Sequence, residues 1–342
     1  MMRAGIAFAL VSAVLFGASA PLAKLLLGRV DPWLLAGLLY LGSGVGLAAL
    51  RPLLPRQGGR LARADWPWLA AAVAAGGVVG PVLMMLGLAH ASASSASLVL
   101  NLEGVFTLGL AWVVFRENVD RRLLVGAGAI LAGAALLSWQ DGSGGGGWGL
   151  WAITGACLAW AIDNNLTRKV SAGDPVEIAM IKGLAAGAVN TALALAIGQD
   201  LPAWPLIGAA AILGLGAYGL SLVLFVLALR HLGTARTGAY FSTAPFVGAA
   251  LAVVVLGEAP TPLLAAAGLL MALGLYLHLT ESHAHDHVHE ALEHDHSHRH
   301  DDHHQHGHAG QDPAVPHSHA HQHQRLVHRH PHYPDIHHRH TH

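Results

Sequence analysis

The sequence predicts an all-α polytopic membrane protein with ten transmembrane helices, arranged as two inverted five-helix repeats. Three observations lead to this fold class: a low charge content, a series of long apolar runs, and residues that recur at a fixed spacing. Of the 342 residues, 54% are hydrophobic and 11% are charged, and the mean hydropathy is +0.48. Soluble domains carry about 25% charged residues. The composition therefore excludes a soluble domain for most of the chain.

Long apolar runs follow one another through residues 1–280, beginning with "GIAFALVSAVLFGASAPLA". A helix needs about 20 apolar residues to cross the hydrocarbon core of a bilayer. A single run could be a signal peptide, but a long series excludes that interpretation. In chain order, the predicted spans are residues 4–27, 32–50, 66–88, 94–115, 121–140, 148–167, 175–198, 204–229, 237–256 and 262–280.

The loops between these spans alternate in charge, which checks the number of spans. Cytoplasmic loops of membrane proteins collect Lys and Arg. The loops of one side contain only Arg29, whereas the other side holds twelve cations: Arg3, Arg51, Arg56, Arg60, Arg63, Arg116, Arg121, Arg122, Arg168, Lys169, Arg230 and Arg236. A missed or invented span would destroy this alternation. We therefore expect a multi-pass protein of the cell inner (cytoplasmic) membrane, with both termini in the cytoplasm.

The helical region also repeats itself. "LAHASASSASLVLNLEGVFTLGLAWVVFREN" aligns with "LRHLGTARTGAYFSTAPFVGAALAVVVLGEA" at an offset of 141 residues, from Leu88 to Leu229. Within this offset, His90 falls on His231 and Glu117 on Glu258; earlier in each half, Asp31-Pro32 matches Asp174-Pro175 and Phe16-Gly17 matches Trp160-Ala161. An odd number of spans per copy inverts the second copy, which is an architecture that transporters use.

These matches divide the chain into four parts. Residues 1–140 form the first repeat, 141–147 a glycine-rich external linker, 148–280 the second repeat and 281–342 the tail. The five-span halves, the fourth spans ending in "FRE" or "LGE" and the glycine-spaced fifth spans resemble the EamA family of the drug/metabolite transporter superfamily. The resemblance covers residues 4–280. It implies ten helices around a central cavity and secondary transport of small organic metabolites.

One departure from the family pattern concerns the fourth span of each copy. The family often has a proline near the position of Gly104, but in this chain only the second copy keeps it, as Pro245. The two halves are therefore not expected to be functionally equal.

Charged residues at membrane depth are candidates for function because burying a charge in hydrocarbon costs about 2.5–3.5 kcal/mol on insertion scales. Glu103 lies deepest, near the middle of the fourth span, with Asn101 beside it and Thr107 one helical turn further. One interpretation is a carboxylate that binds substrate or a proton in the cavity. The other is a neutral, hydrogen-bonded glutamic acid between packed helices.

A second set of polar residues lies on the sixth and seventh spans. Asp163 and Asn164 lie late in the sixth span, and Lys182 lies at similar depth in the seventh. They form either an ion pair between adjacent helices or a cytoplasmic half-site for a zwitterionic or anionic substrate. Further residues that could line the same cavity are Tyr218, Ser221, Tyr240, Ser242 and Thr243.

Charged residues at span ends receive different interpretations. Lys24 is expected to extend its ammonium group to the outer interface. Glu117 and Glu258 are interpreted as interfacial caps rather than ligands.

Signals for catalysis are weak, so no enzyme is expected. The glycine-rich stretch at 142–149 lacks the lysine of a phosphate-binding loop. The histidines of "HEALEH" at 289–294 are five residues apart and cannot chelate zinc together as H-E-x-x-H does. The single cysteine, Cys157, excludes a disulfide framework.

The tail has a different chemistry from the bundle. It is polar, contains four prolines and has too few apolar residues for a core, so it is predicted to be disordered and cytoplasmic. Its His-x-His spacing offers imidazole ligands that suit Zn, Ni, Co and Cu(II). The predicted metal ligands are His285, His287, His289, His294, His296, His298, His300, His303, His304, His306 and His308. No other cofactor is expected.

Three functions remain open at this point. The favoured one is a secondary transporter that moves a small organic metabolite, with export as the favoured direction and the tail as a metal-binding regulator or buffer. The alternative is a transporter of Ni, Co, Zn or Cu that captures ions with its tail. A membrane-anchored metal buffer is disfavoured by the inverted repeats. The expected partners are the lipid bilayer and a small-molecule or ion substrate, with no nucleic acid; the oligomeric state, including a homodimer, is left open.

Overall fold

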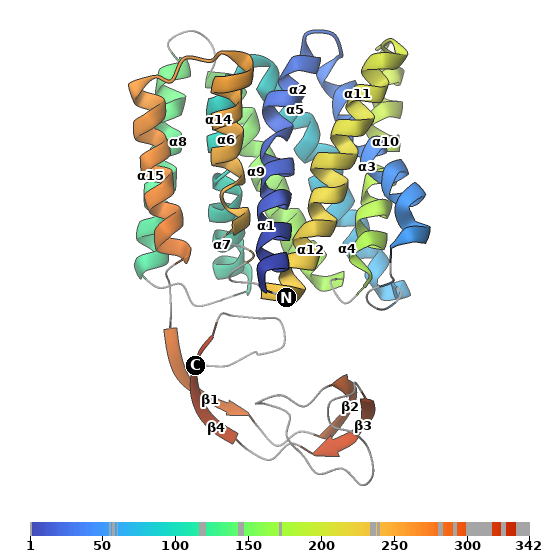
Figure 1. Cartoon of the computed structure of the whole chain (residues 1–342), viewed down its shortest axis with the longest axis vertical. Helices are drawn as coiled ribbons and strands as arrows, with labels where there is room; N and C mark the ends of the chain where they lie inside the picture. Colours follow the sequence, from blue (N-terminus) through green and yellow to red (C-terminus); the bar gives the residue numbers. More distant parts are fainter. Residues whose placement is uncertain are drawn as a thin grey trace. The chain divides into compact units, whose positions relative to one another are not determined.

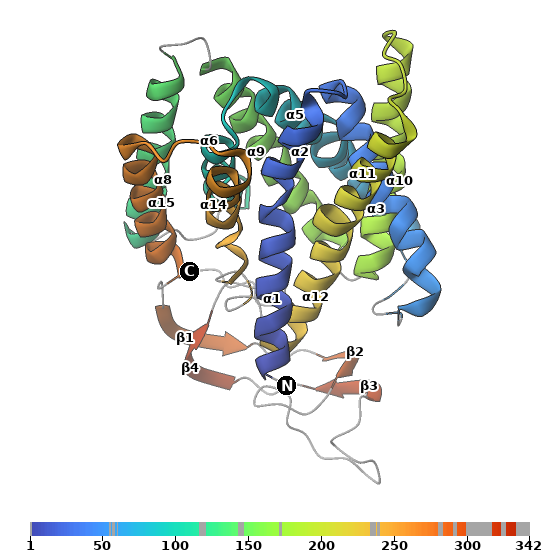
Figure 2. The ribbon, with the colours of Figure 1, turned by 45° about the horizontal axis from the view of Figure 1, so that its top comes forward.

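The computed structural model describes residues 2–54, 56, 59, 61–115, 121–142, 147–170, 173–232, 237, 240–279, 283–289, 293–298, 317–322 and 326–332. The chain divides into two compact units, residues 1–280 and 281–342. The first unit is a bundle of long helices (Figures 1 and 2). The second unit contains short strands.

The helices of the first repeat are α1 (Met2–Gly17), α2 (Ser19–Leu27), α3 (Pro32–Leu50), α4 (Trp66–Ala72), α5 (Gly80–His90), α6 (Ala93–Val99), α7 (Leu102–Phe115) and α8 (Arg121–Gly142). Short 3₁₀ turns η1 (Arg51–Leu53) and η2 (Arg63–Asp65) precede α4, and a π-helical segment η3 (Val73–Val79) joins α4 to α5.

The second repeat contains α9 (Gly147–Thr167), the 3₁₀ turn η4 (Arg168–Val170), α10 (Pro175–Ala196), α11 (Trp204–Gly214), the π-helical segment η5 (Leu215–Leu220), α12 (Ser221–Leu232), α14 (Ala244–Leu256) and α15 (Pro262–Leu279). Helical residues therefore occupy each of the ten predicted span ranges.

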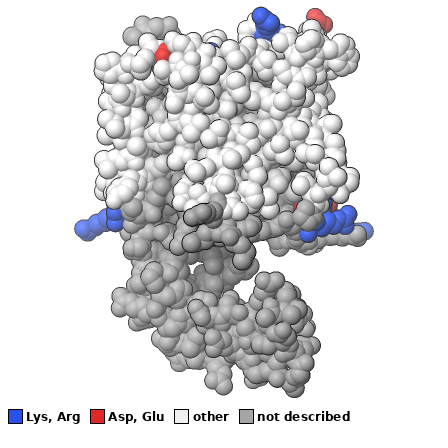
Figure 3. Space-filling model, in the orientation of Figure 1, with Lys and Arg blue, Asp and Glu red and all other residues white. Residues whose placement is uncertain are grey.

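Six helical segments of the described chain are long and apolar enough to cross a membrane. These are Ala4–Leu27, Pro32–Leu53, Arg63–His90, Ala93–Leu110, Pro175–Ala196 and Trp204–Phe225, with shorter apolar helices at Ala244–Leu256 and Pro262–His278. The visible surface has an uncharged belt, with the coloured charged side chains of the bundle near its two ends (Figure 3). The predicted all-α polytopic fold class is confirmed.

The two repeats share their irregularities as well as their helices. Asp31 and Asp174 each cap the following helix, because each carboxylate accepts hydrogen bonds from two backbone N–H groups of the first turn. The π-helical segments η3 and η5 interrupt the third span of each copy at matching positions. The fourth spans also break alike, at residues 100–101 and 242–243. Duplicated breaks at these positions are the structural counterpart of the sequence repeat.

Helices from opposite repeats pack closely through glycines. At the crossing of α3 and α10, a methyl group on Gly44 or Gly187 would overlap the backbone of the facing helix. At the crossing of α8 and α15, a Cβ on Gly274 would lie 2.5 Å from the carbonyl oxygen of Gly126. Small residues permit such backbone approach in lipid, where packing rather than hydrophobicity drives helix association.

The tail unit has strands where the sequence predicted disorder. Strand β1 (His283–His289) pairs antiparallel with β4 (Leu326–His332), and β2 (Glu293–His298) pairs antiparallel with β3 (His317–Gln322). The difference has a physical reason. Low apolar content predicts the lack of a core, but an alternating His-x-His pattern has the two-residue period of a strand.

Candidate functional site

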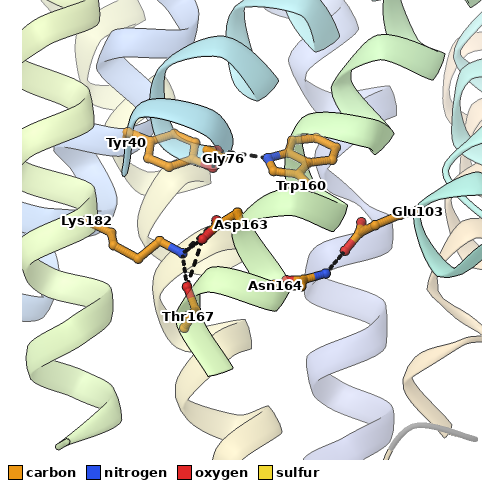
Figure 4. A network of polar contacts seen from close by, with 8 residues as sticks. All are labelled: Tyr40, Gly76, Glu103, Trp160, Asp163, Asn164, Thr167 and Lys182. Atoms are coloured by element: carbon orange, nitrogen blue, oxygen red, sulfur yellow. Dashed lines mark hydrogen bonds and ion pairs between the residues drawn. The ribbon is translucent and has the colours of Figure 1, made fainter. Parts of the chain in front are cut away.

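The helix break in the fourth span positions Glu103. Asn101 is buried at the break, where its Nδ2 donates a 2.8 Å hydrogen bond to the carbonyl oxygen of Leu98. Glu103 then lies in the first turn of α7, at the helix end whose dipole favours a carboxylate. Its Oε1 accepts a 2.8 Å hydrogen bond from Nδ2 of Asn164 on α9 (Figure 4). The predicted Glu103 and Asn164 are thus brought together.

A buried hydroxyl lies one turn along the same helix. Thr107 Oγ1 has no hydrogen-bond partner among the residues that the structure describes. Residues four apart on a helix share a face, so this hydroxyl and the Glu103 carboxylate occupy one side of α7. An unsatisfied buried polar group is costly, and a bound polar solute or water would satisfy it.

The predicted ion pair between α9 and α10 is present. Lys182 Nζ lies 2.6 Å from both carboxylate oxygens of Asp163. Thr167 Oγ1 donates a 2.8 Å hydrogen bond to Asp163 Oδ1 and accepts one from Lys182 at 3.2 Å (Figure 4). The Asp163 and Lys182 side chains are only 9% and 16% exposed. Burial makes the pair interdependent, because either charge alone would be poorly solvated.

The π-helical segment η3 lies directly against this ion pair. A methyl group on Gly76 would overlap the carboxylate of Asp163, so only glycine fits there. A π-helical turn leaves carbonyls without their usual helical partners. The Gly76 carbonyl accepts hydrogen bonds from the Tyr40 hydroxyl at 3.0 Å and from Trp160 Nε1 at 2.9 Å (Figure 4). Side chains from α3 and α9 therefore hold the segment in place.

The neighbouring Gly77 carbonyl is held from a third helix. It accepts a 3.0 Å hydrogen bond from Nδ2 of Asn190 on α10, whose side chain is fully buried. Sequence reasoning missed Tyr40, Gly76, Trp160 and Asn190. The adjacent glycines in "AAVAAGGVVGP" were the available signal, because paired glycines are a recognised cause of helix distortion.

Aromatic rings connect this region to the second π-helical segment. The ring of Tyr40 lies 5.4 Å from that of Tyr218 on η5. Tyr218 also meets Phe16 edge-on at 6.1 Å. Tyr40 therefore contacts η3 through its hydroxyl and η5 through its ring. The predicted site residue Tyr218 therefore lies beside Tyr40 and Phe16. Thr243, another predicted site residue, makes a local contact: its Oγ1 donates to the carbonyl oxygen of Tyr240 at 2.6 Å.

The charged residues of the cluster have no charged counterparts at the positions that the repeat relates to them. At the spacing that relates Phe16 to Trp160, Asp163 and Asn164 correspond to Ser19 and Ala20. At the spacing that relates His90 to His231, Glu103 corresponds to Ala244. There, α1 packs so closely that a methyl group on Gly17 would overlap the Ala244 carbonyl. The counterpart of Glu103 is therefore surrounded by packed backbone.

Two charged residues at span ends bind helix termini. Glu258 accepts hydrogen bonds from the backbone N–H groups of Ala93 at 2.6 Å and Ser94 at 2.8 Å, which confirms its interpretation as a cap. Lys24 donates hydrogen bonds from its ammonium group to the carbonyls of Leu88, Ala89 and Ala91 at the end of α5. Its extension to the outer interface stays a prediction. Glu117 lies outside the described residues.

The structure leaves the metal-binding prediction untested. Within the described residues, no group of three or more His, Cys, Asp or Glu is placed to hold a metal ion. Of the predicted ligands, His285, His287, His289, His294, His296 and His298 lie on strands β1 and β2. The other five, His300, His303, His304, His306 and His308, lie outside the described residues.

The chain is similar to known membrane proteins over its helical part. It matches the EamA-like transporter family over residues 3–139 and 147–280. It is 28% identical over 287 residues to an uncharacterized transporter of Methanothermobacter thermautotrophicus, covering 78% of this chain and 83% of that protein. A protein of known crystal structure shares the fold with a TM-score of 0.58 and 22% identity, over 80% of this chain and 97% of its own. The protein is a multi-pass membrane transporter, and the chain belongs to the EamA-like transporter family.

Proposed function

We propose that the protein is a secondary transporter of a small organic solute that carries an ammonium group, and that Glu103 binds this group. One observation carries the proposal. Glu103 from the first repeat and Asp163, Asn164 and Lys182 from the second gather beside helix irregularities of an otherwise apolar bundle, and the positions that the repeat relates to them carry no charge. Ionisable residues inside transporter helices mark solute and ion pathways.

The chemistry of the cluster supports an ammonium solute. The Glu103 carboxylate accepts a hydrogen bond from the neutral amide of Asn164, and this bond does not neutralise the charge of the carboxylate. Asp163, in contrast, is neutralised by Lys182. A cationic group at Glu103 would supply the missing positive charge. If the solute is zwitterionic, its carboxylate would compete with Asp163 for Lys182.

Movement of the solute requires the helices around the cluster to have two arrangements. The π-helical segment η3 is a position where a helix can change its hydrogen bonds at small cost, because its Gly76 and Gly77 carbonyls already rely on side chains, and η5 is the π-helical segment at the matching position of the second repeat. Rocking of helices around a central site is the mechanism of transporters built from inverted repeats. We propose that η3 and η5 are the hinges of this movement.

We also propose that both termini are cytoplasmic and that transport is directed outward across the cytoplasmic membrane. The distribution of cations supports the orientation, since twelve lie in loops of one side and only Arg29 in loops of the other. Reporter fusions at Gly144 and Arg60 should report opposite compartments, external and cytoplasmic respectively. Equal signals at the two sites would contradict the inverted repeat.

For the tail, we propose binding of Zn, Ni, Co or Cu(II) as a regulatory or buffering function. The support is its composition of closely spaced histidines and interleaved acids. Full-length protein should bind several such ions per chain, a variant ending at Thr280 should not, and binding should weaken below pH of about 6.5, where imidazole is protonated. Equal metal binding by the two proteins would refute it.

The proposed transport function is tested with purified protein and a panel of solutes. Amines, amino acids, carboxylic acids and divalent metals are screened for their effect on the thermal unfolding temperature, because a ligand of the folded state stabilises it. Any stabilising solute is then tested for counterflow in proteoliposomes. We expect the active solutes to carry an ammonium group. Counterflow of divalent metals alone would favour the metal transporter instead.

A further inference from the structure

The corner between α5 and α6 is fixed by two opposite charges. Lys24 donates to carbonyls at the C-terminal end of α5, including that of Ala91 at 2.6 Å. Glu258 accepts from the first N–H groups of α6, Ala93 at 2.6 Å and Ser94 at 2.8 Å. Each charge faces the helix end whose dipole it complements. Only residues 91 and 92 separate the two helices, so both charges act on one sharp corner.

The two charges come from opposite repeats. Lys24 lies on α2 in the first repeat, whereas Glu258 follows α14 in the second. The corner of α5 and α6 therefore connects the two halves that must move relative to one another during transport. The contact with Glu258 joins the two repeats, whereas the contact with Lys24 holds the corner to α2 within the first repeat.

Behind the corner, α6 covers the middle of the bundle. The thiol of Cys157 on α9 is fully buried and donates a 3.6 Å hydrogen bond to the carbonyl of Val99 at the end of α6. On the other side of α6, a methyl group on Gly248 of α14 would lie 2.6 Å from Ser97 Oγ. Displacement of α6 would uncover Cys157 from the end of the bundle at which α2 ends, opposite the N-terminus of α1.

We propose that Lys24 and Glu258 form a two-residue latch that keeps the bundle closed on the face opposite the N-terminus. Opening of this face requires the corner to leave both charges. A latch of this kind sets the balance between the two access states, because removing it lowers the stability of one state only. Transport itself still depends on the cluster formed by Glu103, Asn164, Asp163 and Lys182.

Cys157 tests the latch without knowledge of the solute, because it is the only cysteine. Membrane vesicles of both orientations are treated with a membrane-impermeant maleimide, and the labelling rate is compared for the unchanged protein, Lys24→Met, Glu258→Gln and the control Arg29→Gln. Arg29 is an exposed cation near the same end of α2, so the control loses one charge at that end without touching the latch.

We expect Lys24→Met and Glu258→Gln each to raise labelling from the face opposite the N-terminus roughly tenfold, equivalent to about 1.4 kcal/mol, with no increase from the N-terminal face and no change in Arg29→Gln. Unchanged labelling in both latch variants would overturn the proposal. An equal rise from both faces would also overturn it, because it would show a general loss of packing. These results do not depend on whether Glu103 binds an ammonium solute.

Discussion

The fourth span of the first repeat and its counterpart in the second differ in chemistry but not in their break. Both are interrupted at equivalent positions, residues 100–101 and 242–243. After the first break comes Glu103, hydrogen-bonded to Asn164; after the second comes Ala244, pressed against Gly17. The comparison teaches that the duplication left a helix break in the fourth span of both copies, whereas only the first copy places an acid directly after the break.

The largest loss of stability should come from breaking the buried ion pair of Asp163 and Lys182. Lys182→Met leaves the Asp163 carboxylate without its cation, and breaking a buried pair on one side costs about 3–5 kcal/mol. Thermal unfolding of the purified protein should therefore show a strong loss of stability. The double variant Lys182→Met with Asp163→Asn should recover a large part of it, because no uncompensated charge remains. Equal instability of the single and double variants would show that packing, not charge, is the cause.

A smaller effect should follow from changing the hinge residues of the two repeats. Gly76→Ala places a methyl group into the Asp163 carboxylate, and overpacking costs about 1–3 kcal/mol. At the repeat spacing, Gly76 corresponds to Ala217, which already carries a methyl group. Ala217→Gly should cost only about 1 kcal/mol. Similar losses of unfolding free energy in Gly76→Ala and Ala217→Gly would mean that η3 and η5 are equivalent.

The smallest effect should come from the residue that contacts both hinges. Tyr40→Phe keeps the ring contact with Tyr218 but removes the hydrogen bond to the Gly76 carbonyl. Because Trp160 still donates to that carbonyl, we expect a loss of about 1 kcal/mol in unfolding free energy. Tyr40→Leu, which also removes the ring, should cost more. A larger loss in Tyr40→Phe than in Tyr40→Leu would contradict the assignment of both contacts.

Much of the fold follows from sequence patterns. The apolar runs, the alternating loop charges and the repeat predict the helical ranges because helix length in a membrane is set by bilayer thickness. The Asp163–Lys182 pair was also predictable, since a buried acid and base at similar depth on adjacent helices stabilise each other. The partners of Glu103 were only partly predictable, because Asn164 was identified as a candidate but not as its hydrogen-bond donor.

Other features lay outside what single residues indicate. The π-helical segment η3 is held by Tyr40, Trp160 and Asn190, which lie on three different helices and meet only in the folded bundle. For Lys24 the outer end of its span was predicted, but not its acceptors, the C-terminal carbonyls of α5, because they belong to a different helix. The strands of the tail arise from backbone pairing between segments far apart in the sequence, such as His283 with His332, which a criterion based on core formation does not detect.

The central claim is that Glu103 in the first repeat binds the cationic group of the solute. It is tested most directly by counterflow of an ammonium solute through proteoliposomes containing Glu103→Gln, which keeps the shape of the side chain and removes its charge. The matched control is Glu177→Gln, in the first turn of α10, which removes a carboxylate away from the cluster. We predict that Glu103→Gln lowers counterflow at least about tenfold, as expected for the loss of about 1.4 kcal/mol of binding, with folding and the Glu177→Gln rate unchanged. Full counterflow in folded Glu103→Gln protein would contradict the account.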